Sequence, residues 1–496
     1  MGLSVNKLFS DNMVLQRDVV FYVSGKGEPG MQVRVKIQNQ EQSAVVAGNS
    51  WRVAIGPLKT GFCEELVIEA NGDTIKFKNV AVGDVFLLAG QSNIEFEFYQ
   101  SAAFKNDLPY CKNNGIRYLE IPRIEYRKDG RAYPDLKTEP WAVCDQETAP
   151  AMSAVGLYFA HFLNRDKNIP IGLISMNKGG SSASCWISET YLKKDDSVFK
   201  KYWLDYYEGI NDQSDSQEDE ARAKYNLSLN QYLTRLEEYH NLYPERSTSQ
   251  MKKDLGHTPW PPPKGKRDAF RPSGLYDMMF KLVKDFRFKS VIYYQGEEDT
   301  RHGEIYKRLL SLLIENWRED FQNEVPFVIV ALPEYNDDKN DKWSLVRDAQ
   351  GEVCANHPGA YLVVSLNCGE EFNIHPQEKV ELAYRIFARV KEAFYDHGYA
   401  GHAPCIVKTA VQNGILTLGF DQNIRVAGPI EILEDGKAVE SVTTDGNNLS
   451  IAITPGCLKV EYCHQNYCKS HIVGRNNLPI AGFEIDLARL NQVNRY

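Results

Sequence analysis

The feature that most constrains the fold is an alternation of apolar, strand-like runs with helix-like segments between residue 81 and about residue 400. Such alternation predicts a parallel β-sheet covered by helices. Glycine or polar residues follow several of the runs at once, at the carboxyl ends of the strands, where ligands bind in open parallel sheets. The strand-like runs are 85–89, 171–176, 291–294, 327–332 and 361–366, and the helix-like segments are 154–164, 275–286, 304–321 and 379–395.

The chain on either side of this region has a different pattern. Residues 1–80 hold short β-branched and aromatic segments separated by glycines, which is typical of a small β-sandwich. Residues 403–496 are again β-rich, with turn sequences such as Asp435-Gly436. A charged, aromatic stretch at about 190–270 interrupts the alternation and predicts a helical insertion, as a lid or as a solvated excursion. We therefore expect three domains, at 1–80, 81–402 and 403–496.

Composition excludes several classes of protein. The 496 residues carry a formal net charge of −9, which argues against a nucleic-acid binder. No apolar stretch reaches the ~20 residues of a membrane span, and residues 1–7 show no apolar h-region of a signal peptide. Ten cysteines include no CxxC pair, so zinc spacing is absent. The clustered Cys457, Cys463 and Cys468 fit either one disulfide in an exported protein or buried free thiols.

Gly90-Gln91-Ser92-Asn93 follows the buried run 85–89 directly. A glycine there lets the backbone turn sharply, and the serine falls where a helix would begin, among free backbone N–H groups. A serine placed this way can act as a nucleophile whose own amide helps to hold an oxyanion. The alternative is an ordinary N-cap serine.

Two further stretches follow predicted strands. Gly179 and Gly180 come after the run 171–176, where an N–H group could supply a second oxyanion donor; a plain strand-to-helix turn is the alternative. After the run 291–294, Gln295 offers a side-chain amide donor, and Glu297 could orient a histidine or bind substrate hydroxyls. The acidic residues here also fit the N-terminus of a helix, where the macrodipole favours them.

His375 lies just before an amphipathic helix, with a proline at the helix start. A lone histidine is usually structural or solvated. This one lies in the last αβ segment of the predicted domain, from which a general base can reach back to a serine. None of the other nine histidines has a comparable context.

Taken together, these stretches resemble the sialate O-acetylesterases, a family of the SGNH hydrolase superfamily. The resemblance covers almost the whole chain. It implies an SGNH, flavodoxin-like α/β fold, with a three-layer parallel-sheet core and a small β-domain at each end. The matching segments are 9–17, 82–85, 90–93, 170–174, 179–180, 272–276, 294–297, 317–318 and 374–376.

The resemblance implies Ser92 as nucleophile and His375 as general base and acid. It also implies oxyanion donors from the Ser92 amide, from a Gly179 or Gly180 amide, and from Gln295. The chain departs from the family at the acid of the triad, because Phe372 and Asn373 stand where relatives have aspartate. A Ser-His dyad is therefore an alternative, with a backbone carbonyl, Asn373 or Glu297 orienting the imidazole.

The resemblance predicts an extracytoplasmic serine esterase that removes O-acetyl groups from free or glycan-linked sialic acids through an acetyl-enzyme, without metal or organic cofactor. Gln91, Asn93 and Trp186 are the candidate substrate-binding residues, although a tryptophan is more often part of the core. An arginine should pair with the sialate carboxylate, and the candidates are Arg271, Arg301, Arg347 and Arg385. The rival hypotheses are an acetylxylan or other carbohydrate acetylesterase and a catalytically inactive carbohydrate-binding protein.

Overall fold

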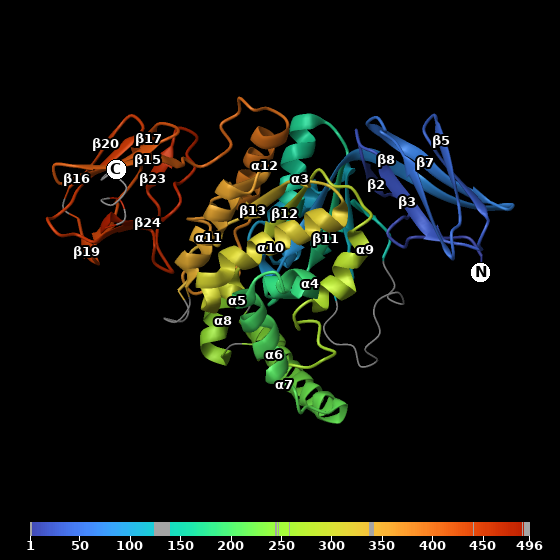
Figure 1. The fold of residues 1–496 in the computed structure, drawn as a ribbon, viewed down its shortest axis with the longest axis horizontal. Coiled ribbons are helices and arrows are strands. Elements are labelled where there is room, and N and C mark those ends of the chain that lie inside the picture. The colour runs from blue at the N-terminus through green and yellow to red at the C-terminus, as the bar shows by residue number, and fades with distance from the viewer. Residues whose placement is uncertain are drawn as a thin grey trace.

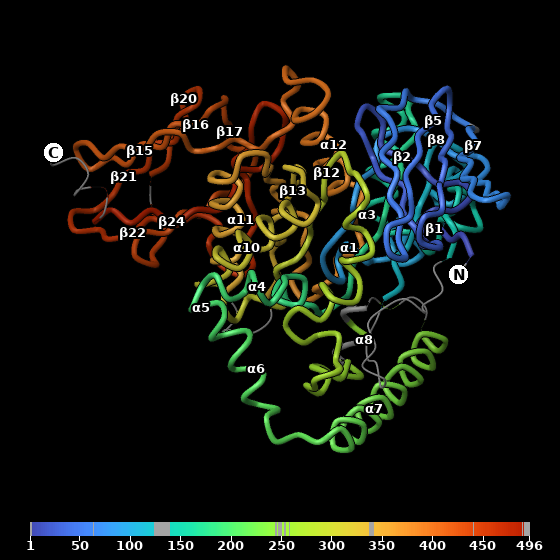
Figure 2. The backbone as a smooth tube through the Cα atoms, turned by 45° about the vertical axis from the view of Figure 1, so that its right-hand side comes forward, coloured from blue at the N-terminus to red at the C-terminus, as the bar shows by residue number. Residues whose placement is uncertain are grey.

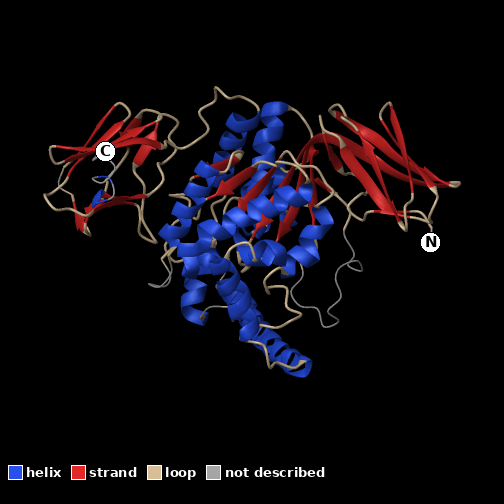
Figure 3. Cartoon of the chain, viewed as in Figure 1, coloured by secondary structure: helices blue, strands red, loops and turns tan. Residues whose placement is uncertain are grey.

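The computed structural model describes residues 2–123, 139–243, 246, 248–256, 258–336, 342–439, 441–488 and 490. A central body of helices packed on a sheet lies between two β-rich regions, which contain the two ends of the chain (Figure 1). Colouring by secondary structure separates the helical centre from the two β-rich ends (Figure 3). The α/β class predicted from the alternation is confirmed by this architecture.

The central sheet has the strand order β10-β9-β11-β8-β12-β13-β14. Every neighbouring pair in it is parallel except β10 with β9. The strands are β8 (Asp73–Gly90), β9 (Asn113–Glu120), β10 (Ala142–Cys144), β11 (Ile171–Asn177), β12 (Ser290–Tyr294), β13 (Phe327–Val330) and β14 (Ala360–Val363). The chain crosses from β8 to one side and later to the other, so β8 marks the topological switch point where ligands bind in such sheets.

Helices cover both faces of this sheet, and alternate residues of β8 face opposite sides. Phe86 and Leu88 belong to the same apolar cluster as α3 and α12, whereas Val85 and Leu87 belong to the cluster that contains α10 and α11. Such a strand is buried on both faces, which explains its uninterrupted apolar run. The four helices are α3 (Ala154–Lys167), α10 (Gly303–Phe321), α11 (Trp343–Asn356) and α12 (Val380–Phe394).

The N-terminal region is joined to the centre by β8 itself. The first half of this strand pairs with β7 (Gly61–Ala70) and β2 (Val14–Gln16), and its second half pairs with β11 and β12. One continuous strand therefore connects the N-terminal strands to the central sheet. The remaining N-terminal strands are β1 (Ser4–Val5), β3 (Phe21–Lys26), β4 (Gln32–Ile37), β5 (Gln40–Val45) and β6 (Ser50–Ile55).

The stretch predicted as a helical insertion is helical. It includes α4 (Glu189–Leu192), α5 (Asp196–Val198), α6 (Asp205–Glu208), α7 (Asp215–Leu242) and α8 (Thr248–Leu255). A capping box between Ser214 and Gln217 starts α7. Figure 2 shows α7 at the margin of the molecule, with α6 leading toward it from the central body.

The C-terminal region contains two four-stranded sheets and one strand pair, formed from β15 (Ile406–Gln412) to β24 (Phe483–Asp486). It has an apolar core of its own, with Leu416, Leu449 and Val460 among the buried residues. Cys457, Cys463 and Cys468 are free thiols here, so the disulfide alternative is not the state of this structure. No helix among the described residues is both long and apolar enough to cross a membrane.

Candidate active site

The carboxyl ends of three neighbouring strands meet at one edge of the central sheet. Gly90 of β8 pairs in register with Asn177 of β11 on one side and with Tyr294 of β12 on the other. Parallel pairing brings the residues that follow these strands together, although they are far apart in the sequence. This edge is where the predicted catalytic segments converge.

Ser92 is held at this edge by a turn that requires glycine. Gly90 has a φ of +139°, and a Cβ there would lie 2.0 Å from the carbonyl oxygen of Tyr294. Gln91 then extends the chain, and Ser92 is the first residue of α1 (Ser92–Glu95). The N-cap position belongs to Gln91, which makes no side-chain cap, so Ser92 is not an N-cap serine. Ser92 is half-buried and lies in the turn that directly follows β8.

The hydroxyl of Ser92 contacts the imidazole of His375, from the loop before α12. Ser92 Oγ and His375 Nε2 lie 2.7 Å apart, across 283 positions of sequence. Asn373 fixes the backbone of that loop, since its Oδ1 accepts the His375 N–H at 3.2 Å and its Nδ2 donates to the His375 carbonyl at 2.8 Å. Asn373 Nδ2 also donates to Glu370 Oε2 at 3.1 Å. This contact between a hydroxyl and an imidazole suits nucleophilic catalysis.

Ser92 and His375 open onto a pocket of about 520 Å³. Of its lining residues, only Ser92, Asn373 and His375 were site candidates from the sequence, and the others include Arg123 and His240. His240 belongs to α7, so the helical insertion contributes to the wall of this pocket. The lining residues are Ser92, Glu95, Phe96, Glu97, Tyr99, Gln100, Arg123, His240, Asn373, His375 and Gln377.

Gly179 lies beside Ser92, as the resemblance requires of an oxyanion donor. A Cβ built on Gly179 would lie 3.3 Å from the Cβ of Ser92. Its N–H, however, donates to the Oε2 atom of Glu95, three residues after Ser92. Gly180 faces the other way: its φ is +71°, and a Cβ there would lie 2.1 Å from the Trp260 ring. Gly179 therefore lies on the Ser92 side of the turn, and Gly180 lies on its Trp260 side.

The prediction that Gln295 donates to an oxyanion is wrong. Its side chain is fully buried, and Nε2 donates to Asp299 Oδ2 at 2.7 Å, to Ser181 O at 3.1 Å and to Gln91 Oε1 at 3.2 Å. Its Oε1 accepts from Tyr306 Oη at 2.8 Å. The amide is thus saturated by core partners, and its function is to hold the turns after β8, β11 and β12 together.

Two of the three predicted substrate contacts also lie in the core. Gln91 is buried, and its Oε1 accepts backbone N–H groups from Gly296 at 3.4 Å and Glu298 at 3.3 Å. Trp186 is buried, and its indole N–H donates to Ser181 Oγ at 2.9 Å. Neither side chain is available to a substrate, because the hydrogen bonds of each are made inside the protein. For Trp186, the core alternative weighed from the sequence is the correct one.

The third predicted contact, Asn93, is buried directly behind the Ser92–His375 pair. Its Nδ2 donates to Glu297 Oε1 at 2.7 Å and to the carbonyl of Ile374 at 2.9 Å, and its Oδ1 accepts from Lys379 Nζ at 2.9 Å. Because Ile374 directly precedes His375, Asn93 links the nucleophile turn to the histidine loop. Glu297 thus acts on that loop through Asn93 in this structure.

Burial shifts both ionisable groups of this cluster. It raises the pKa of Glu297, opposed by the hydrogen bond from Asn93. It also lowers the pKa of Lys379 to about 8, with the nearby Glu297 carboxylate acting in the opposite direction. Both side chains are almost completely buried, so the cluster is a charged support beneath the catalytic pair.

None of the four arginines expected for the sialate carboxylate lines the Ser92 pocket. Arg347 donates to the Cys463 carbonyl at 3.3 Å in the C-terminal region, and Arg385 donates to the Leu366 carbonyl at 2.8 Å. Arg271 pairs with Asp277 at 3.1 Å. Each of these contacts lies away from the pocket, and Arg301 is likewise not among its lining residues.

Among the described residues, Arg123 is the arginine that lines the pocket. It forms ion pairs with Glu120 at 3.0 Å, with Glu97 at 3.4 Å and with Glu95 at 3.5 Å. It follows β9, whose carboxyl end lies at the same edge of the sheet. That position, one loop after a strand, is the sequence signal by which it could have been found.

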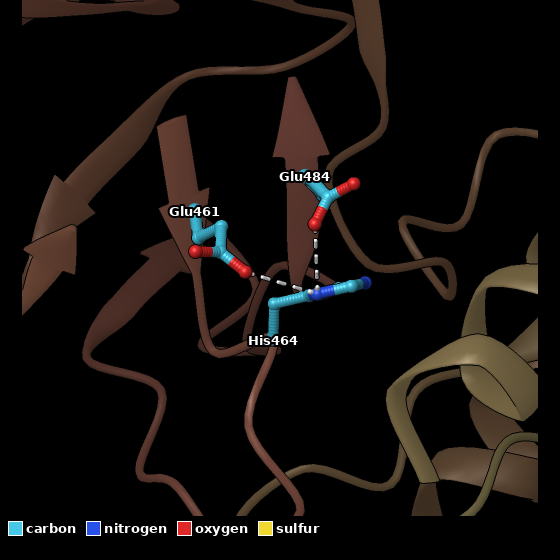
Figure 4. Close-up of side chains that lie close together, drawn as sticks. All are labelled: Glu461, His464 and Glu484. Carbon is cyan, nitrogen blue, oxygen red and sulfur yellow. Dashed lines mark ion pairs between the residues drawn. The ribbon is translucent and has the colours of Figure 1, made fainter. Parts of the chain in front are cut away.

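A cluster with metal-ligand chemistry lies far from this site, in the C-terminal region (Figure 4). Among the residues that the structure describes, Glu461, His464 and Glu484 bring ligand atoms within 4.8 Å of one another. Lys459 Nζ already lies 3.2 Å from Glu461 Oε1 and 3.0 Å from Glu484 Oε2. His464 Nε2 lies 2.6 Å from Asp348 Oδ2 of α11. These ion pairs account for the cluster without a metal ion.

Comparisons with known proteins agree with the geometry. Residues 265–387 match the family described as "Carbohydrate esterase, sialic acid-specific acetylesterase". This segment contains His375 and Glu297 but not Ser92. A carbohydrate acetylesterase from Xanthomonas citri has a similar fold, with a TM-score of 0.76, 20% identity, and coverage of 97% of this chain and 99% of that one.

Curated relatives extend the similarity over most of the chain. The sialate O-acetylesterase of Mus musculus is 24% identical over 473 residues, which is 87% of this chain and 81% of that protein. The Homo sapiens sialate O-acetylesterase is 23% identical over 469 residues, or 86% of this chain and 78% of that protein. The resemblance seen in the sequence is confirmed: the chain is similar to sialate O-acetylesterases over most of its length, and residues 265–387 match the sialic acid-specific acetylesterase family of carbohydrate esterases.

Proposed function

We propose that this protein is a serine esterase that hydrolyses the O-acetyl esters of sialic acids. The observation that carries the proposal is the 2.7 Å contact between Ser92 Oγ and His375 Nε2 at the switch point of the sheet. The family match over residues 265–387 supports the substrate class. A Ser-His contact at a pocket also argues against the rival hypothesis of an inactive binding protein.

The geometry supports a two-step acyl transfer. His375 Nε2 accepts the Ser92 proton while Oγ attacks the acetyl carbonyl, and the imidazolium then protonates the departing sugar oxygen. Water, deprotonated by the same imidazole, attacks the acetyl-enzyme, and the imidazolium returns the proton to Ser92 Oγ as the acyl bond breaks and acetate leaves. Asn373 and Asn93 act as positioning residues, because they hold the backbone on both sides of the imidazole.

The oxyanion of each tetrahedral intermediate needs preset N–H donors. The Ser92 N–H lies in the first turn of α1, where no intrahelical acceptor exists. The Gly179 N–H is the second donor, since Gly179 lies against Ser92. It becomes available once the Glu95 carboxylate withdraws, and Arg123 is placed to receive that carboxylate. Gly180 is assigned no oxyanion role because it faces Trp260.

Arg123 lines the pocket beside Ser92, but it already pairs with Glu95, Glu97 and Glu120, so we assign it to Glu95 rather than to the sialate carboxylate. We also propose that the fold is of the SGNH type, with a small β-domain at each end. The domain boundaries then lie near residues 80 and 402. The supporting observations are the parallel central sheet with Ser92 directly after β8, and the separate core of the C-terminal region. The extracytoplasmic location stays a prediction from the family.

The test is hydrolysis of 9-O-acetyl-N-acetylneuraminic acid and of an aryl acetate. Wild type should hydrolyse both, and Ser92→Ala and His375→Ala should each lose about 10³-fold or more of kcat. Ser228→Ala, at an exposed serine on α7, and His397→Ala, at an exposed histidine, are the matched controls. Undiminished turnover by Ser92→Ala would overturn the mechanism. Hydrolysis of acetylated xylan in preference to the sialate ester would favour the other carbohydrate esterases.

A further inference from the structure

A second cavity lies on the far side of the Gly179–Gly180 turn from Ser92. It has a volume of about 260 Å³, and the mechanism does not use it. It lies between the turn and the helical insertion. Its walls combine aromatic rings with ionisable side chains. The lining residues include Gly180, Tyr202, Asp205, Trp260, Phe270 and Glu298.

Trp260 is the most exposed of these rings. Its side chain is 47% exposed, although a tryptophan normally contributes strongly to a core. One edge of the indole packs against Gly180, where any Cβ would collide with it, and the ring meets Phe270 edge-on at 5.6 Å. These contacts hold the ring in place while leaving part of its surface open to the cavity.

The remaining walls are polar and rigid. Tyr202 donates its hydroxyl to Asp299 Oδ1 at 2.9 Å, which fixes the ring. Asp205 pairs with Lys201 at 3.5 Å, and Glu298 is exposed. Aromatic faces beside a few oriented polar groups are typical of small-molecule sites. A sugar ring matches this chemistry, because its C–H face packs on an aromatic ring while its hydroxyls bond to carboxylates.

Charge limits the kind of sugar. Among the described lining residues, Asp205 pairs with Lys201 at 3.5 Å, Asp268 pairs with Arg222 at 2.9 Å, and Asp299 accepts hydrogen bonds from Ser182 and Tyr202. Glu298 is an exposed carboxyl group at the cavity, so a neutral sugar suits it better than a second anionic one. The cavity volume lies just below ~300 Å³, the lower end of the volumes of ligand pockets. A cavity of this size has room for one sugar ring rather than for a longer chain.

The cavity is close enough to the catalytic pair to share a substrate with it. Gly180 lines the cavity, and its neighbour Gly179 lies against Ser92. Consecutive Cα atoms are about 3.8 Å apart. On the other side, the Glu298 N–H donates to Gln91, the residue before Ser92. The two pockets are thus separated by one turn of backbone.

We propose that this cavity is a subsite for a neutral hexose joined to the acetylated sugar, so that the preferred substrate is a glycan rather than a free monosaccharide. This inference rests on the proposed function. The acetylated residue occupies the Ser92 pocket, and the next sugar crosses the Gly179–Gly180 turn and packs on Trp260.

The test compares kcat/KM for 9-O-acetyl-3′-sialyllactose with kcat/KM for free 9-O-acetyl-N-acetylneuraminic acid. Wild type should prefer the trisaccharide by about tenfold, and Trp260→Ala should bring this ratio close to one. Trp260→Phe keeps an aromatic face and should keep most of the preference, and Glu298→Gln should lower it about threefold. Tyr110→Ala, at an aromatic residue that is 80% exposed elsewhere, should leave the ratio unchanged.

Equal kcat/KM values for the two substrates in wild type, or equal losses for both in Trp260→Ala, would overturn the subsite. If wild type hydrolyses neither ester, the proposed function fails separately. Calorimetric titration of lactose then decides the subsite: saturable binding that Trp260→Ala abolishes supports it, and binding that is absent or insensitive to Trp260→Ala overturns it. Circular dichroism verifies that each variant is folded.

Discussion

The carboxylate of Glu95 accepts the N–H of Gly179 beside Ser92, where the oxyanion of an ester intermediate would need that donor. The other Glu95 oxygen faces Arg123 at 3.5 Å. A charge-assisted hydrogen bond of this kind is about twice as strong as a neutral one, so the carboxylate competes with the developing oxyanion. In the proposed mechanism, the Glu95 side chain therefore moves from Gly179 toward Arg123 during turnover.

Glu95→Gln should therefore raise kcat for an aryl acetate, by about threefold to tenfold, because a neutral amide holds the Gly179 N–H less strongly. Initial rates at saturating substrate measure the effect. Glu97→Gln is the matched control, since Glu97 lines the same pocket and pairs with Arg123 at 3.4 Å. A lower kcat in Glu95→Gln than in wild type would show that the carboxylate assists the transition state instead.

Asn93→Ala should slow turnover by more than about tenfold, or roughly 1.4 kcal/mol, because the histidine loop loses its link to the nucleophile turn. It should also destabilise the fold, at about 1–3 kcal/mol for each buried group left without a partner. Glu297→Gln retains an oxygen acceptor for Asn93 Nδ2 and should slow turnover by less than tenfold. Rates and urea unfolding of both variants test this. A larger loss in Glu297→Gln than in Asn93→Ala would place the carboxylate in direct contact with the imidazole.

Gly180→Ala should be destabilising for two reasons, a left-handed backbone worth about 1–2 kcal/mol and a collision with Trp260. Removing the indole should relieve the second. We therefore expect the loss of unfolding free energy caused by Gly180→Ala to be about 1 kcal/mol smaller in a Trp260→Ala background than in wild type. Urea denaturation of the four proteins gives the coupling. An identical penalty in both backgrounds would show that Trp260 does not pack on the glycine.

Lys379 makes stability depend on pH. Burial lowers its pKa from the ordinary 10.5 to about 8, so between these values the unfolded chain holds a proton that the folded protein has lost. The free energy of unfolding contributed by this group should therefore rise with pH across that window. Urea denaturation from pH 8 to 10 should show a smaller rise in Lys379→Met than in wild type. The exposed Lys224→Met should match wild type, and equal slopes in all three proteins would contradict the prediction.

Local patterns predicted the strands β8, β11, β12, β13 and β14 and the place of the nucleophile, but not the strands β9 and β10. The run before Ser92 is apolar because β8 is buried on both faces, and Gly90 marks the sharp turn through its positive φ. Helix α11 (Trp343–Asn356) was not predicted. Its apolar residues recur at helical spacing, but Gly351 within it weakens the propensity signal.

The functions of Gln295, Trp186 and Asn93 could not be predicted locally. Each follows a strand at the catalytic edge or lies close to one, and a polar or aromatic side chain there can face either the pocket or the core. Partners from distant segments decide between these: Gln91 and Ser181 for Gln295, Trp317 for Trp186, and Lys379 for Asn93.

The sequence by itself determined the class of fold, the turn that bears Ser92 and the histidine placed ahead of α12, because each depends on hydrophobic period, glycine or proline within a few residues. Only the tertiary structure decided which side chains meet. It brought His375 to Ser92, Glu95 to Gly179 and Trp260 to Gly180. Such contacts depend on the parallel register of strands and on close packing between segments far apart in the chain, which no local pattern specifies.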